Sequence, residues 1–277
     1  MAVTGLDPRI IKVGINLDGG MSYYTDLAIT ARGIKYGNPN PGECRIQIDN
    51  LTRAHRNFIL TQTSIFKPQN DPVKVTVEAG RKSIGTTLVF SGYVILSNVT
   101  QPPDIGIVMN CVNYFPQTNE IVNANYGQST PLSVIAQGAA NQMGKKLSFQ
   151  GADKLVSNYT LSGSASENVN KLAQTGEYDV YVDNDTLTIK DRNKPIEGDI
   201  IEMNKNTGMI GIPEVTQTGI RFKCLINPAV NLGALVNLTS ELNPAINGQY
   251  VIYAIAFDIA TRENQFYYVC ECQNALG

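Results

Sequence analysis

The sequence has 277 residues, of which 43% are hydrophobic and 17% charged, and its formal net charge is −2. This length favours two or three folding units over one small domain. This net charge argues against nucleic-acid binding as its main role, because that role needs a basic face that neutralises phosphates. Because soluble domains carry about 25% charged residues, the low charge favours a protein that buries much of its surface against other chains, and a β-protein with a neutral surface is the alternative.

Charge distribution and apolar runs also bear on partners and location. Residues 1–127 hold 11 basic and 9 acidic side chains, whereas residues 196–277 hold 4 and 8, an asymmetry that favours head-to-tail contact between copies. No apolar run approaches the roughly 20 residues that cross a bilayer, and the first residues lack the basic start and apolar stretch of a secretory signal. We therefore expect a reducing cytosol and free thiols at all five cysteines: Cys44, Cys111, Cys224, Cys270 and Cys272.

Residues 1–126 predict an all-β unit interrupted by one short helix. Apolar and polar residues alternate in several runs, and this period of two places one face of each strand in a core. The predicted strands cover residues 11–17, 44–48, 73–79, 88–95 and, after the break at Pro102-Pro103, 105–112. Within residues 51–64, by contrast, Ala54, Phe58 and Ile59 recur at helical spacing.

Residues 127–195 predict a small α+β unit that begins with a helix. Thr130 can cap this helix with Pro131 at its first position, and apolar residues at helical spacing then give it a buried face. Gly144 is expected to end it. So small a unit has a thin core, and we expect it to lean on its neighbours.

The same unit contains a second helix and a hairpin. Ser164 and Glu167 form a capping box, which predicts a helix that ends at Gly176. Two short strands follow within residues 178–190, and Asp183-Asn184-Asp185 supplies the turn between them.

Residues 196–277 predict a second β unit. Its apolar runs are closed by Gly, Pro or Asn turns, as a small antiparallel barrel requires. In the first strand of its last hairpin, we expect one face to carry Val251, Tyr253, Ile255 and Phe257. In the second strand, we expect one face to carry Phe266, Tyr268, Cys270 and Cys272. The expected fold is thus mainly β, with two antiparallel β-barrels separated by an α+β insert.

Three blocks follow one another in a fixed order along nearly the whole chain. The first comprises Val75-Thr76-Val77-Glu78-Ala79-Gly80, Phe90-Ser91-Gly92-Tyr93-Val94 and Pro102-Pro103-Asp104. The second is the helix from Pro131 with Tyr159-Thr160-Leu161-Ser162-Gly163-Ser164, and the third joins residues 208–219 to Leu225-Ile226-Asn227-Pro228 and Asn247-Gly248. In this order and spacing the chain resembles the baseplate hub proteins of contractile-tailed bacteriophages and the related hub part of contractile secretion-system spikes.

This resemblance implies two barrels of the tail-tube kind in each subunit and a trimeric ring. Three subunits would present six barrels, which adapts a threefold central spike to a sixfold tail tube. The implied partners are further copies of the chain, the spike protein, the tube protein and neighbouring baseplate proteins, without nucleic-acid specificity or membrane insertion. The implied location is the tail baseplate of the virion, after assembly in the bacterial cytoplasm. Larger relatives carry a fused lysozyme or spike domain, and this sequence does not.

Few residues suggest catalysis or ligand binding. His55, the sole histidine, lies on the predicted short helix without an acid and a nucleophile beside it, which favours a surface role. Cys270 and Cys272 share a strand face and Cys224 could lie near them, but zinc sites pair cysteines at a wider spacing, so small core residues are favoured. Gly208-Met209-Ile210-Gly211 lacks the Lys-Ser/Thr and the helix of a phosphate loop, and a turn is predicted.

Two acidic motifs also have simpler interpretations. Asp183-Asn184-Asp185 begins like a calcium loop, but Thr188 and Lys194 stand where that loop needs Gly and Glu. Asp199 and Glu202 could form a glycosidase dyad, yet they lie in a linker-like segment of a chain without tryptophan. The sequence therefore assigns no catalytic, cofactor-binding or metal-binding residue, and it predicts a protein that is not an enzyme.

Two other classes of function stay open at this point. A receptor- or carbohydrate-binding tail component would expose an aromatic platform, for which Tyr23-Tyr24 and Tyr267-Tyr268 are the candidates. A tail-associated hydrolase would need a cluster of titratable groups that the sequence does not reveal. The favoured interpretation is a structural baseplate hub.

Overall fold

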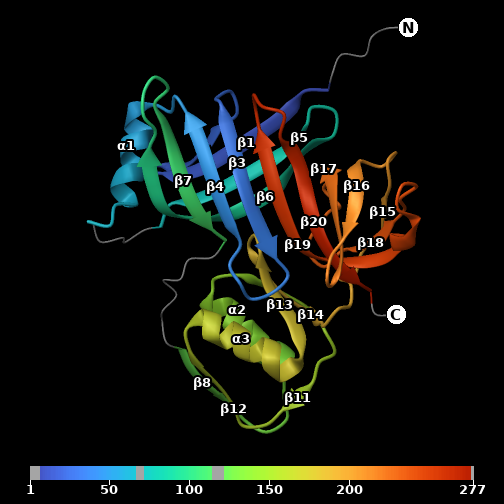
Figure 1. Cartoon of the computed structure of the whole chain (residues 1–277). Helices are drawn as coiled ribbons and strands as arrows, with labels where there is room; N and C mark the ends of the chain where they lie inside the picture. Colours follow the sequence, from blue (N-terminus) through green and yellow to red (C-terminus); the bar gives the residue numbers. More distant parts are fainter. Residues whose placement is uncertain (1–6, 67–71, 114–121, 276–277) are drawn as a thin grey trace.

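The computed structural model describes residues 7–66, 72–113 and 122–275, and within them one large sheet contains both the first and the last described strand (Figure 1). The first seven strands of this sheet are β1 (Arg9–Leu17), β2 (Gly20–Tyr24), β3 (Ile29–Tyr36), β4 (Glu43–Asp49), β5 (Lys74–Arg81), β6 (Gly85–Val99) and β7 (Gly106–Val112). The other six are β15 (Ile201–Met203), β16 (Met209–Val215), β17 (Gly219–Leu225), β18 (Leu235–Leu238), β19 (Gly248–Ala260) and β20 (Phe266–Asn274). The mainly β character predicted from the sequence is confirmed.

Two sets of five consecutive strands repeat the same pairing scheme. In the N-terminal set, β3 to β7, the antiparallel ladders join β3 to β4, β4 to β7, β7 to β6 and β6 to β5. In the C-terminal set, β16 to β20, they join β16 to β17, β17 to β20, β20 to β19 and β19 to β18. The two sets are therefore equivalent strand by strand. The flanking strands differ, because β1 pairs antiparallel with β5 whereas β15 pairs parallel with β18.

The two sets meet through an antiparallel ladder between β3 and β19, which runs from the pair Tyr36 and Ala254 to the pair Thr30 and Ala260. This ladder changes the predicted architecture. Two antiparallel β-barrels, with the α+β insert between them in the sequence, were expected, but the ladders among the described residues form no closed ring. The reason is that the outer edge of β3 is paired with β19, so it cannot close on β2, whose own second edge has no partner strand within the described part of the chain.

Both sets contribute to one hydrophobic core on the inner face of the bent sheet. Side chains of β1, β4 and β5 that alternate in the sequence are buried there, as predicted, and they join Phe266, Tyr268, Cys270 and Cys272 of β20. Phe90 of β6 and Phe257 of β19 lie with ring centroids 6.3 Å apart, and Phe257 is 2% exposed. The sequence patterning thus identified the inner faces, but the sharing of one core follows from the β3–β19 ladder.

A β-bulge corrects one predicted face. Val251, Tyr253, Ile255 and Phe257 were expected on the same side of β19, but the register with β20 shifts between Ile252 and Ala254. The extra residue reverses the alternation at that point. Tyr253 consequently lies outside the core, where its hydroxyl donates to Glu271 at 2.9 Å, while Ile255 and Phe257 stay inside.

The segment between the two sets folds as an insert with its own small core. Its elements are β8 (Val122–Tyr126), β9 (Thr130–Pro131), α2 (Leu132–Gln142), β10 (Lys146–Gln150), β11 (Leu155–Val156), β12 (Tyr159–Gly163), α3 (Ala165–Gly176), β13 (Tyr178–Asp183) and β14 (Thr186–Asp191). In Figure 1 the helices lie together on one side of the insert, and the β13–β14 hairpin points toward the base of the sheet. Elsewhere, α1 (Arg53–Gln62) and the short helix η1 (Pro244–Ile246) flank the sheet.

The helix ends that the sequence predicts in the insert are confirmed, with one exception. The Ser164–Glu167 capping box opens α3, which ends at Gly176, and Gly144 follows α2 with φ +62°. Thr130 does not cap α2, because Pro131 occupies the cap position with an extended backbone and no side-chain bond. Strand β8 precedes the predicted boundary at residue 127 but pairs with β12. Residues 114–121, which belong to the predicted first unit, lie outside the described residues.

Candidate functional site

The β13–β14 turn meets the sheet through a buried ion pair. Lys35 lies on β3 at an inward-facing position and is only 4% exposed. Its Nζ donates to Oδ1 of Asp183 at 3.0 Å, and the Asp183 side chain is itself 17% exposed. A pair this far from solvent holds the turn in one place, because separating the charges would leave both without a partner.

Asp185, at the other end of the turn, contacts two further lysines. Lys74 of β5 lies 3.1 Å from Oδ2, and Lys145 of the insert lies 3.2 Å from Oδ1. Burial raises the pKa of the Asp185 carboxyl, but these two ammonium groups outweigh that effect and hold its pKa below the ordinary value of 3.8. Burial lowers the pKa of Lys145, and the nearby Asp185 carboxylate offsets part of this decrease. Asp185 thus joins the insert to β5 by charge.

Neutral hydrogen bonds complete this joint. The Asn113 side chain, 2% exposed, donates its amide to the Val182 carbonyl at 2.6 Å and accepts from the Gly42 backbone N–H at 3.0 Å. Tyr181 places its ring in the core of the sheet, and its hydroxyl donates to the Leu232 carbonyl at 3.0 Å. The insert therefore contacts both the N-terminal and the C-terminal parts of the sheet.

Acidification is expected to weaken this joint. A carboxyl whose pKa is depressed by folding adds stability above its unfolded-state pKa and loses it as the pH falls through the folded-state value. The free energy of unfolding should therefore fall below about pH 4, in part through Asp185. The variant Asp185→Asn should show a smaller fall between about pH 6 and about pH 3, measured by urea unfolding at each pH. Equal falls in both proteins would contradict this role.

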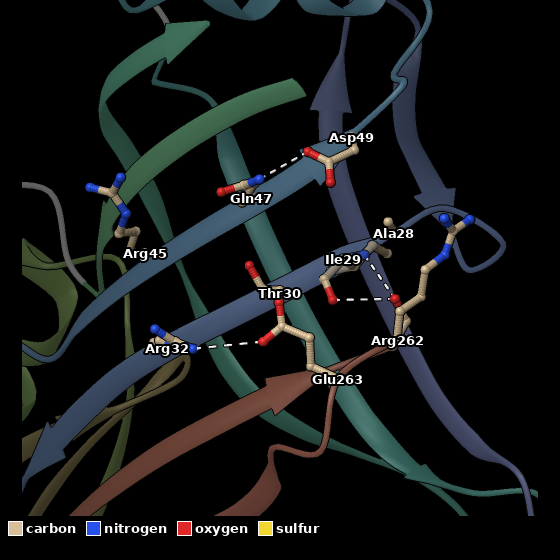
Figure 2. Close-up of a pocket in the computed structure, with 10 residues that line it drawn as sticks. Ala28, Ile29, Thr30, Arg32, Arg45, Gln47, Asp49, Arg262 and Glu263 are labelled. Atoms are coloured by element: carbon tan, nitrogen blue, oxygen red, sulfur yellow. Dashed lines mark hydrogen bonds and ion pairs between the residues drawn. The ribbon is translucent and has the colours of Figure 1, made fainter. Parts of the chain in front are cut away.

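A polar hollow of about 350 Å³ lies on the outer face of the sheet, where β3 and β4 meet the β19–β20 turn (Figure 2). Arg32 donates from Nε to Oδ1 of Asp258 at 2.9 Å and also approaches Glu263, whereas the Arg45 guanidinium has no ion pair or hydrogen bond within the described residues. Gln47 donates to Asp49 at 2.9 Å. Acidic and basic groups in nearly equal number suit contact with another protein surface.

The residues that suggested catalysis take structural positions. Nδ1 of His55 lies 2.6 Å from the Tyr24 hydroxyl, so the imidazole is half-buried between α1 and β2 and not free on the surface. Cys224, Cys270 and Cys272 do lie near one another, fully buried in the core, and burial raises the pKa of the Cys270 and Cys272 thiols. Within the described part of the chain, no group of three or more His, Cys, Asp or Glu side chains is arranged to hold a metal ion.

The remaining motifs also lie in regular strands and turns. Asp199 is exposed, and the Glu202 carboxylate on β15 accepts from the Asn237 amide at 2.9 Å. Gly208 and Gly211 have φ of +110° and +75° at the start and at the irregularity of β16, and no helix follows them. The Asp183-Asn184-Asp185 motif is a hairpin turn, as predicted. Its contacts with Lys35 and Lys74 were not predicted, although a lysine at an inward position of β3 is a signal for a buried acidic partner.

The two tyrosine pairs do not form flat exposed platforms. Tyr23 is 55% exposed, and the Lys12 ammonium lies 4.1 Å from its ring centroid, while Tyr24 contacts His55. Tyr267 lies on the outer face beneath Lys223, and Tyr268 is buried on the inner face. Among the described helices, none has the length together with the apolar character that a bilayer crossing demands.

Solved structures of tail proteins share this fold at low sequence identity. The 43 kDa tail protein of prophage MuSo2 from Shewanella oneidensis gives a TM-score of 0.65 at 11% identity, over 96% of this chain and 98% of that one. The tail protein from Neisseria meningitidis MC58 gives 0.64 at 7%, over 95% and 96%. The E. coli c3393 protein, a component of the type VI secretion system, gives 0.61 at 9%, over 95% and 77%.

Sequence comparison with protein families gives a match over most of the chain. A search among curated proteins found no match. Residues 10–272 match the family described as baseplate hub gp41, a span that runs from β1 to β20 and includes the insert. The chain belongs to the baseplate hub gp41 family.

Proposed function

We propose that the chain is a structural subunit of the baseplate hub in a contractile phage tail, and that three copies form a ring. This ring would adapt a threefold central spike to a sixfold tail tube. The repeated ladders of β3 to β7 and β16 to β20 are the observation that carries the proposal. Two equivalent strand sets lie side by side in each chain, so three chains supply six sets around one axis.

The proposed division of labour follows the three predicted parts of the chain. Residues 1–126 and 196–277 would form the ring through their strand sets, each in the role of one tube-like barrel. Residues 127–195 would lie outside it as a separate α+β part, held by the joint at Asp183 and Asp185. The polar hollow beside Arg32 and Arg45 offers a surface for a neighbouring baseplate, spike or tube protein. Assembly would take place in the bacterial cytoplasm before the virion is complete.

A structural role without catalysis is proposed because the titratable candidates serve packing. His55 is engaged by Tyr24, the three neighbouring thiols are in the core, and Glu202 is bonded to Asn237. A receptor- or carbohydrate-binding role has less support, because the tyrosine pairs that suggested it are divided between the two faces of their strands.

The mass of the purified protein in solution tests the proposal. We expect size-exclusion chromatography with light scattering to give three times the chain mass of 30.1 kDa for the protein alone, or that mass plus the mass of the spike protein once the spike protein is added. Electron-microscopy class averages should then show a ring with a threefold outline and a sixfold inner rim. A monomer that persists at high concentration in the presence of the spike protein would refute the ring.

A further inference from the structure

Two arginines lie directly opposite each other on the outer face of the sheet, Arg32 on β3 and Arg45 on β4 (Figure 2). Like charges in this arrangement destabilise a sheet. Carboxylates offset the charge of Arg32, because Asp258 lies 2.9 Å from its Nε and Glu263 lies 4.0 Å from its guanidinium. Arg45 is exposed, and within the described residues it has no ion pair or hydrogen bond. The pairing of β3 with β4 therefore leaves one positive charge without compensation.

The neighbour of Arg45 on the other side also lacks a partner. Asn110 of β7 is directly opposed to Arg45, and its side-chain amide makes no hydrogen bond within the part of the chain that the structure describes. A guanidinium offers a planar fork of N–H donors, and an amide adds two more. An arginine can bind a carboxylate through two parallel hydrogen bonds, so these two neighbouring side chains match the oxygens of a carboxylate.

Exposed apolar side chains follow on β6. Leu96 is directly opposed to Asn110 and is 39% exposed, and Ile95, the extra residue of the bulge, is 41% exposed. Ile95 lines a second hollow of about 420 Å³, which Arg45 borders as well and which is more apolar than the hollow beside the β19–β20 turn. The four opposed residues form one row across β3, β4, β7 and β6, which we call the outer row: Arg32, Arg45, Asn110 and Leu96.

We propose that the outer row binds an extended segment of a neighbouring tail protein, through an acidic side chain at Arg45 and an apolar side chain at Ile95 and Leu96. The inference deepens the proposed function, in which this face is a contact surface. The incoming carboxylate supplies the counter-charge that Arg45 lacks. Neighbouring strands lie about 4.8 Å apart, so Arg45 and Leu96 are separated by about 10 Å. Side chains two or four residues apart, which lie on the same side of an extended segment, can span this distance.

A protein segment fits the outer row better than a nucleic acid does. A phosphate backbone needs a run of basic groups, but the carboxylates beside Arg32 lie on one side of Arg45 and apolar side chains lie on the other. Glu43, two residues before Arg45 on β4, also lines the second hollow and would repel a chain of phosphates. A single carboxylate beside an apolar side chain matches both parts of the row, whereas a continuous polyanion matches only one.

The stability of Arg45→Gln shows whether Arg45 serves the fold or a partner. This variant removes the opposition of like charges, so its free energy of unfolding in urea should equal or exceed that of the unchanged protein. A clear loss of stability would give Arg45 a structural role and overturn the proposal. The matched control is Arg262→Gln. Arg262 is an exposed arginine that lines the polar hollow, and it has no ion pair within the described residues, but it lies in the β19–β20 turn, outside the ladder.

Selection from random octapeptides displayed on yeast, with the full-length protein as bait, tests the binding itself. Enriched peptides should carry Asp or Glu, with Leu, Ile or Val two or four positions away. Fluorescence anisotropy with a labelled copy of an enriched peptide should show binding weakened about tenfold or more by Arg45→Gln, because a hydrogen bond between charged groups is lost. Arg45→Lys should bind with intermediate affinity, since lysine keeps the charge without the fork. Arg262→Gln should bind as the unchanged protein does.

Three outcomes would overturn the proposal. The first is that no peptides of this pattern are enriched, and the second is that they bind Arg45→Gln as tightly as the unchanged protein. The third is that a labelled single-stranded DNA oligonucleotide binds more tightly than the peptide and with the same dependence on Arg45. Light scattering tests the ring separately. An assembly of threefold mass that binds no such peptide would overturn this contact alone, and a monomer that binds the peptide would overturn the ring alone.

Discussion

Replacing Lys35 with methionine is expected to lower the free energy of unfolding by about 3–5 kcal/mol, the range found when one partner of a buried ion pair is removed. Lys35 is 4% exposed and its ammonium is 3.0 Å from Asp183. Methionine keeps most of the side-chain volume, so the loss should come from the carboxylate of Asp183, which would stay out of solvent without a partner. Urea unfolding followed by circular dichroism measures the change.

Two further variants separate the ion pair from other effects. In K35M/D183N both charges are absent, and we expect most of the lost stability to return, because a buried pair replaced as a whole is often nearly neutral. Lys205 pairs with Glu241 at 2.7 Å, but these side chains are 62% and 69% exposed. Lys205→Met should therefore change stability by less than about 1 kcal/mol. If Lys35→Met and Lys205→Met had equal effects, the joint between insert and sheet would not depend on this pair.

The contrast between the two lysines shows which parts of the site the sequence could reveal. The turn at Asp183-Asn184-Asp185 was predicted because turn chemistry is local. Its binding partners were not, because Lys35 lies on a strand 148 positions earlier in the chain. The available signal was the alternation of β3, in which Lys35 occupies the inward series with Ile29 and Ala31. A lysine at such a position needs a buried acidic partner, but sequence order does not say which one.

For the fold as well, features set by local sequence were predicted, and features set by long-range contacts were not. Strand faces in β1, β4 and β5 and both ends of α3 follow from local periodicity and capping, and they were predicted. The ladder between β3 and β19 joins residues more than 200 positions apart, and nothing local marks it. This ladder joins the strands of the two expected barrels into one continuous sheet. The bulge beside Tyr253 was also missed, because tyrosine suits either face of a strand.

The second large effect is expected at the place where the two strand sets share their core. Phe257 of β19 is 2% exposed and packs against Phe90 of β6, with ring centroids 6.3 Å apart. Across the β3–β19 ladder it covers Gly33, where a Cβ atom would collide with its ring. Phe257→Ala should lower the free energy of unfolding by about 3–5 kcal/mol, because it removes apolar contacts and leaves a cavity between the two sets.

The matched control for Phe257→Ala is Phe149→Ala in the insert, where the ring is half-buried and packs edge-on against Tyr178 at 5.6 Å. We expect a smaller loss there, because a partly exposed ring has less apolar area to return to water. If both strand sets share one core, Phe257→Ala should shift the unfolding of the whole sheet in a single transition. Amide exchange in β4 and β20 would follow the two sets separately. If amide protection were lost in β20 alone, the two strand sets would unfold independently. They would then be neighbours in one sheet that do not share a common core.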